Sequence, residues 1–266
     1  MPLAATESSQ GPAARPRLRA LDALRGFSVI SMVLFHAAYD IASVYQAGFA
    51  WFRPPLQDIW RCSISWTFLL IAGVMCNFSR DNFKRAGRYL AVAALVFVVT
   101  SVAQVDVPIS FGIIFCMGAS TLTYACLAAL GLTGKEGGGS TAADLLCAGA
   151  LFLAFLLCLQ VPQGVVGLGP WQVALPRAPY ESGLLDWAGF PSPLFASGDY
   201  YPVIPYTLLF LAGARVGCAL LRHEGACAWL SSHGCSPLEW IGRHALWIYV
   251  LHQPVLVGIF TLVFGR

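Results

Sequence analysis

Long apolar runs separated by short polar segments dominate this chain. Only Asp106, Val107 and Pro108 separate the third run from the fourth, which favours a tight turn and a helical hairpin. The pattern predicts an all-α fold, a polytopic membrane bundle of about seven transmembrane helices. A window of about 19 residues places the apolar runs near 24–46, 60–78, 89–105, 109–132, 143–160, 202–221 and 245–264.

The composition supports this prediction. Apolar side chains make up 58% of the 266 residues, and charged side chains only 11%. A soluble domain of this size would need a charged exterior, and the long uncharged runs leave too few residues to build one. We therefore expect one transmembrane domain over residues 21–266, preceded by a polar, disordered cytoplasmic tail over residues 1–20.

Basic residues report the orientation of the bundle. If the amino terminus lies inside, only four arginines lie outside: Arg53, Arg61, Arg177 and Arg266. We therefore predict the amino terminus inside and the carboxyl terminus outside. Because the net charge is only +3 and the cations are scattered, we expect no nucleic-acid partner. The inner side then collects Arg15, Arg17, Arg19, Arg25, Arg80, Lys84, Arg85, Arg88, Lys135, Arg215, Arg222 and Arg243.

Cysteines and loops carry weaker signals. The nine cysteines show no CxxC spacing, and the last inner loop holds His223, Cys227, His233 and Cys235 at no usual zinc-finger spacing, so we expect no metal. Residues 133–141 are glycine-rich and predict a flexible inner linker. The long segment 161–201, rich in aromatics and prolines, either covers or binds an acceptor or lies on lipid headgroups.

The first apolar run and the residues just before it carry four ionisable residues: Asp22, Arg25, His36 and Asp40. At 100° per residue they fall within an arc of roughly 60° on one helix, which makes a single polar stripe. Intramembrane ionisable groups are costly and usually functional, so we take all four as candidate catalytic residues.

His36 is the strongest candidate for a general base. It lies roughly 16 Å along the helix from Arg25, near mid-bilayer if Arg25 lies at the inner interface. Histidine titrates near neutrality, which suits removal of a proton from a hydroxyl or amine, and Asp40 could orient the imidazole. The structural alternative is that His36 hydrogen-bonds a neighbouring helix while Arg25 reaches the headgroups.

The run LDALRGFSVISMVLFH resembles the first-helix signature of the transmembrane acyltransferase superfamily, an arginine followed after ten residues by a histidine. Arg25 and His36 match it. Three further stretches, 109–120, 199–217 and 238–254, resemble the bacterial branch named for the heparan-alpha-glucosaminide N-acetyltransferase catalytic domain (DUF1624-like).

The resemblance implies an enzyme of the bacterial inner (cytoplasmic) membrane. It would move an acetyl or similar acyl group from an acyl-CoA, bound from the inner side, to a sugar or amino sugar. The family's lysosomal enzyme is expected to use a histidine between its first two helices, and this chain has none between His36 and His223. The assignment of His36 therefore rests on the broader superfamily.

Donor phosphates need cations, and the second inner loop supplies Arg80, Lys84, Arg85 and Arg88. Arg85 and Arg88 also resemble the superfamily's arginine pair. Positive-inside anchoring alone is the alternative explanation. Arg215 and Arg243 are weaker donor-binding candidates. His244 and His252 lie about 80° apart on the last helix and share a side, so one of them is expected to face a cavity. The equal alternative is that His252, close to Pro254, satisfies backbone carbonyls that the proline frees.

These inferences predict a carbohydrate-modifying acyltransferase that uses acetyl-CoA as co-substrate and no metal. A small transporter with a proton or substrate path along the polar stripe is the first alternative, although the two halves show no inverted repeat. A non-catalytic subunit of a larger membrane complex is the second. Homo-oligomer formation stays open.

Overall fold

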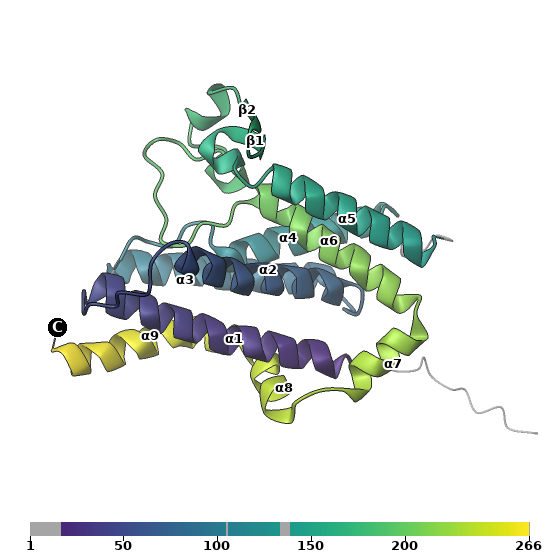
Figure 1. The fold of residues 1–266 in the computed structure, drawn as a ribbon, viewed down its shortest axis with the longest axis horizontal. Helices are drawn as coiled ribbons and strands as arrows, with labels where there is room; N and C mark the ends of the chain where they lie inside the picture. Colours follow the sequence, from purple (N-terminus) through teal and green to yellow (C-terminus); the bar gives the residue numbers. More distant parts are fainter. Residues whose placement is uncertain (1–16, 105, 134–138, 266) are drawn as a thin grey trace, which may run out of the picture.

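The structure is a computed structural model that describes residues 17–104, 106–133 and 139–265 (Figure 1). Residues 1–16 of the expected tail lie outside it, as do residues 134–138 of the expected inner linker. The helices are α1 Arg19–Tyr39, α2 Leu56–Cys76, α3 Asn82–Ala103, α4 Ile113–Ala129, α5 Thr141–Leu157, α6 Val203–Leu221, α7 Glu224–Ser232, α8 Ser236–Arg243 and α9 Ala245–Phe264.

The membrane spans follow the apolar runs. Six of the described segments are long and apolar enough to cross a bilayer, and the shorter apolar helix α4 makes the seventh predicted span. The first begins at α1 and continues through a π-helical turn, η1 Asp40–Val44. This confirms the predicted all-α membrane bundle. The expected hairpin is also confirmed, because α3 and α4 pack against each other along their lengths.

Two of the spanning helices, α3 and α5, begin with a short polar residue whose side chain caps the helix. The carboxylate of Asp81 accepts a hydrogen bond from the backbone N–H of Lys84 at 2.9 Å, at the start of α3. The hydroxyl of Ser140 does the same for Ala143 at 3.1 Å, at the start of α5. Each cap satisfies an N–H group that the first helical turn leaves without a partner.

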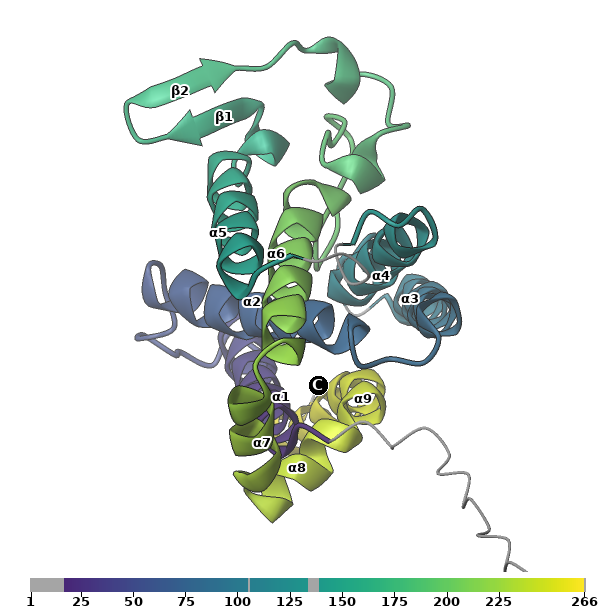
Figure 2. The ribbon, with the colours of Figure 1, turned by 90° about the vertical axis from the view of Figure 1, so that its right-hand side faces the viewer.

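The helices form two groups. In Figure 2, α1, α7, α8 and α9 lie together on one side of α2, and α5 and α6 lie on its other side. Helices α2 and α6 approach closely because a Cβ at Gly73 would lie 2.0 Å from the carbonyl oxygen of Phe210, and one at Gly213 would lie 2.3 Å from that of Leu70. Small residues therefore set this contact, as is common where helices pack in lipid.

The segment between α5 and α6 contains structure that the sequence did not predict. It forms an antiparallel hairpin of β1 Val165–Leu168 and β2 Trp171–Ala174, flanked by the short 3₁₀ turns η2 Val161–Gln163, η3 Ala178–Tyr180 and η4 Asp186–Ala188. Trp171 is 84% exposed. Both interpretations of this segment, an acceptor cover and a headgroup-lying cap, stay predictions.

Basic residues gather at one end of the bundle. There α1, α3 and α5 begin and α2, α4 and α6 end, and we call it the basic end; the opposite end, which carries the β-hairpin, is the loop end (Figure 1). Of the described residues that the sequence assigned to the inner side, all lie toward the basic end. Which side of the membrane that end faces stays a prediction.

Candidate active site

The polar stripe of α1 divides into two parts. At the basic end, Asp22 and Arg25 form an ion pair at 3.1 Å, and Asp22 also pairs with Arg17 at 2.8 Å. Near the loop end, His36 and Asp40 face α9 instead. The structure thus places all four candidate catalytic residues on α1 and its continuation, but not in one site.

His36 lies against a second histidine. The rings of His36 and His252 lie 4.8 Å apart between centroids, at an interplanar angle of 58°. His36 is partly buried and His252 is only 9% exposed. Within the described residues the structure shows no hydrogen bond to the His36 ring, so its nitrogens remain open to chemistry rather than tied to a neighbouring helix.

Asp40 binds a residue that the sequence analysis missed. Its carboxylate is fully buried and accepts hydrogen bonds from Nε2 of Gln253, at 2.9 and 3.1 Å. The described residues show no hydrogen bond between Asp40 and His36. The expectation that Asp40 orients the imidazole directly is therefore not supported by a contact. The signal for Gln253 was its place in the resembling stretch 238–254, directly after His252.

We call His36, Asp40, His252 and Gln253 the α1–α9 polar cluster. Asp40 begins the π-helical turn, and π-helical insertions are frequent at functional sites. Each side of the cluster contributes one histidine and one member of the carboxylate–amide pair. Grouped ionisable side chains inside a membrane domain are a candidate active site.

Of the two carboxyl-terminal histidines, only His252 joins the cluster. His244 lies before α9, where it is exposed. Its ring packs against that of Trp240 in a tilted arrangement, with 4.4 Å between centroids, and its Nδ1 lies 2.8 Å from the Trp240 carbonyl oxygen. The expectation that the two share a side of the last helix is wrong, because the chain ends α8 at Arg243 and α9 begins only at Ala245.

The predicted donor cations also separate. Arg85 points into the bundle, where it donates to the Ala72 carbonyl at 3.1 Å and to the Tyr89 hydroxyl at 3.3 Å, and it lies within electrostatic range of Arg25. Arg80, Lys84 and Arg88 are exposed at the basic end. Arg25 and Arg85 therefore form an interior cationic pair, with three further cations outside it.

Arg215 and Arg243 are engaged elsewhere. Arg215 forms an ion pair with the buried Asp144 at 2.8 Å and donates to the Thr133 carbonyl at 2.6 Å. Arg222 binds the same carboxylate at 2.8 Å. Arg243 is exposed and donates to the Glu239 carbonyl of its own helix at 3.3 Å. The Asp144 ion-pair network holds α5 to α6.

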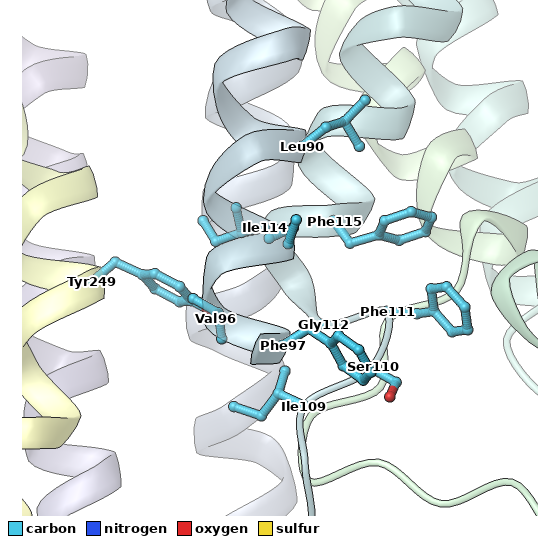
Figure 3. Close-up of a pocket in the computed structure, with 12 residues that line it drawn as sticks. Leu90, Val96, Phe97, Ile109, Ser110, Phe111, Gly112, Ile114, Phe115 and Tyr249 are labelled. Carbon is cyan, nitrogen blue, oxygen red and sulfur yellow. The ribbon is translucent and has the colours of Figure 1, made fainter. Parts of the chain in front are cut away.

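An apolar cavity of ≈ 380 Å³ lies between α3 and α4 (Figure 3). Phe97, Phe111 and Phe115 line it, and Tyr249 closes it from α9. The Tyr249 carbonyl contacts Nδ1 of His252 at 2.7 Å, so the cavity adjoins the α1–α9 polar cluster. Its lining contains no cation, which makes it unsuited to the phosphates of a nucleotide-bearing donor.

The histidines of the last loop, considered above as metal ligands, have separate structural roles. The His223 ring accepts a hydrogen bond from the Ala226 N–H and caps α7, and His233 stacks on Trp229. Across the described ranges, no group of three or more His, Cys, Asp or Glu side chains is placed to hold a metal ion.

Comparison with known families supplies the remaining evidence. The family model for heparan-alpha-glucosaminide N-acetyltransferase, catalytic, matches residues 17–254. No curated protein and no solved structure gave a significant match. The match spans every helix from α1 to α8 and the first half of α9, including the whole α1–α9 polar cluster. The chain therefore belongs to the heparan-alpha-glucosaminide N-acetyltransferase catalytic family, whose members are membrane proteins of acetyltransferase type.

Proposed function

We propose that this protein transfers an acetyl or similar acyl group from acyl-CoA to a sugar or amino sugar, with His36 as general base. The observation that carries the proposal is the His36–His252 pair, packed between α1 and α9 with the His36 nitrogens free of bonds to described residues. Family membership supplies the class of reaction. We further propose that the enzyme lies in the bacterial cytoplasmic membrane with the basic end inside.

The donor would enter from the basic end. Coenzyme A carries phosphates, and phosphates bind best to arginine and lysine groups. Arg25 and Arg85 lie within electrostatic range of each other inside the bundle, whereas Arg80, Lys84 and Arg88 are exposed. A nucleotide held by these cations would direct its thioester arm along α1, because Arg25 and His36 lie on nearly the same face of that helix.

The proposed reaction balances in one displacement. His36 takes the proton from an acceptor hydroxyl or amine, whose oxygen or nitrogen attacks the thioester carbonyl. The carbon–sulfur bond then breaks, the acyl group stays on the acceptor as an ester or amide, and His36 returns the proton to the departing thiolate. The products are the acylated acceptor and free coenzyme A. An acyl-histidine intermediate would divide the same balance into two steps.

The test is acetyl-CoA binding and turnover by detergent-purified protein. We expect His36→Ala to bind acetyl-CoA and to lose turnover by about 10²-fold or more, the range of general-base catalysis. Arg25→Ala should instead weaken acetyl-CoA binding. His233→Ala is the matched control, because that histidine is exposed and stacks on Trp229 away from the cluster. Well-folded wild type that binds no acetyl-CoA would contradict the proposal and favour a transporter.

A further inference from the structure

The amide of Gln253 has only one orientation that fits its partner. A carboxylate accepts hydrogen bonds and donates none when ionised, so the Asp40 carboxylate requires the NH₂ group of Gln253 to face it. Both of its oxygens indeed contact Nε2, at 2.9 and 3.1 Å. The Gln253 carbonyl oxygen, Oε1, is therefore turned away from Asp40. It is buried and has no hydrogen-bond partner among the described residues.

The ring of His252 is fixed in the same way. Its Nδ1 lies 2.7 Å from the Tyr249 carbonyl, and a carbonyl oxygen only accepts, so the proton of the neutral ring is on Nδ1. Nε2 then carries a lone pair and is an acceptor. It too is buried and without a hydrogen-bond partner in the described part of the chain. Consecutive residues of α9 thus present two unpartnered acceptor atoms.

Unpartnered acceptors inside a membrane domain are costly, and native structures keep few of them without a reason. Here the neighbouring groups actively maintain the arrangement, since Asp40 holds one acceptor in place and the Tyr249 carbonyl holds the other. Both acceptors belong to the cluster that contains His36, whose ring lies 4.8 Å from that of His252. The chemistry that satisfies two acceptors is a ligand with two hydrogen-bond donors.

We propose that Gln253 Oε1 and His252 Nε2 form the acceptor subsite, in which they accept hydrogen bonds from O–H or N–H groups of a polyhydroxylated acceptor beside His36. Asp40 is a positioning residue that acts through Gln253. The inference rests on the proposed function and adds to it the residues that hold the acceptor. It also gives the buried Asp40 carboxylate a task other than orienting His36.

The substitution Asp40→Asn separates this subsite from a merely structural contact. Asparagine is nearly the same size, but its Nδ2 can donate to Gln253, so the Gln253 amide can turn over and still make one hydrogen bond between the helices. In the turned orientation the subsite presents an N–H in place of an oxygen, whereas in the original orientation Nε2 of Gln253 donates to the amide oxygen introduced at position 40. We expect KM for the acceptor to rise, by up to about tenfold where the turned orientation dominates, with acetyl-CoA affinity within about twofold of wild type.

The double variant Asp40→Asn/Gln253→Glu provides the rescue. A carboxylate at position 253 can accept from the introduced amide at position 40 with one oxygen and keep the other free as an acceptor. We expect it to recover acceptor KM to within about threefold of wild type. Gln253→Met, which fills the space without hydrogen-bonding groups, should show the raised KM and no rescue. His252→Phe keeps an aromatic ring against His36 but removes Nε2, and should raise the same KM.

The experiment measures acetyl transfer from acetyl-CoA to glucosamine, glucose and N-acetylglucosamine by the full detergent-purified chain, with thermal unfolding recorded for each variant. The proposal expects saturable transfer to at least one probe and the pattern of KM values given above. Unchanged acceptor KM in both Gln253→Met and His252→Phe overturns it, as does a wild type that binds and hydrolyses acetyl-CoA but transfers to none of the probes. Folded wild type that binds no acetyl-CoA contradicts the proposed function instead.

Discussion

Gly26 of α1 packs directly on the backbone of Leu238 in α8. A Cβ added at Gly26 would lie 1.9 Å from the Leu238 carbonyl oxygen, and one added at Gly242 would lie 1.9 Å from the carbonyl oxygen of Asp22. The two helices therefore touch backbone to backbone, one residue from Arg25. This contact fixes the basic end of α1, the helix that carries both Arg25 and His36.

Replacing Gly242 with alanine should destabilise the fold and weaken donor binding together. The clash is with backbone atoms, which cannot move as a flexible side chain can, so α8 must shift away from α1. Overpacking of this kind costs about 1–3 kcal/mol. Thermal unfolding in detergent and acetyl-CoA titration measure the two effects. Gly258→Ala is the control, because a Cβ there meets nothing within 4 Å and should leave both unchanged.

Arg215 should prove to be a residue of the fold rather than of the donor site. Its guanidinium binds Asp144 and the Thr133 carbonyl, and Asp144 is 1% exposed. We expect Arg215→Gln to lower the free energy of unfolding by about 1–3 kcal/mol and to leave the Kd for acetyl-CoA nearly unchanged. Arg85→Gln should raise that Kd. Calorimetric titration of both variants with acetyl-CoA distinguishes a structural role from donor binding. A raised Kd in Arg215→Gln alone would place Arg215, and not Arg85, in the donor site.

The spans and the stripe on α1 were predictable because both are local properties. A run of apolar residues long enough to cross a bilayer defines a helix without reference to the rest of the chain, and the spacing of Arg25 and His36 follows from helical geometry. The position of His252 beside His36 was predictable only in part. The sequence suggested that His244 or His252 faces a cavity, but it did not indicate which of the two. The break between α8 and α9 decided it.

What the sequence could not supply are partners far apart along the chain. Nothing local indicates that Asp40 meets Gln253, or that Asp144 binds both Arg215 and Arg222. The β-hairpin at 165–174 was missed because each strand is only four residues long and lies within a segment rich in proline and glycine. Asn77 is fully buried, and nothing in the residues next to it indicates the partners that it meets on other helices.

Substitution of Asn77 should lower the stability of the fold more than substitution at most positions outside the candidate site. Its Nδ2 donates to the Ala214 carbonyl at 2.7 Å, and its Oδ1 accepts from the Tyr124 hydroxyl at 2.9 Å, so one amide joins α2, α4 and α6. Tyr124→Phe removes one hydrogen bond and should cost about 1 kcal/mol in the free energy of unfolding, whereas Asn77→Leu leaves several groups without partners and should cost more. Equal thermal stability of Asn77→Leu and wild type would refute this role.

The carboxylate of Asp199 gives the loop end a pH-dependent contribution to stability. Asp199 lies in the segment before α6 and accepts a hydrogen bond from the Ile113 N–H at 3.0 Å, at the start of α4. Burial raises the pKa of its carboxyl above the ordinary value, although the Ile113 hydrogen bond and the Arg61 guanidinium offset part of this effect. The protonated form is therefore favoured in the folded protein.

It follows that the contribution of Asp199 to stability is fully present below the unfolded-state pKa of about 4 and is lost as pH rises through the higher pKa of the folded state. Asp199→Asn stays neutral at every pH and keeps an oxygen that can accept from Ile113. We expect its thermal unfolding temperature to match wild type near about pH 4 and to exceed it near about pH 8. Asp199→Leu, which loses the acceptor, should be less stable than Asp199→Asn at both. A constant difference between Asp199→Asn and wild type across this range would show that the folded-state pKa of Asp199 is not raised, and that Asp199 acts on α4 through its hydrogen bond alone.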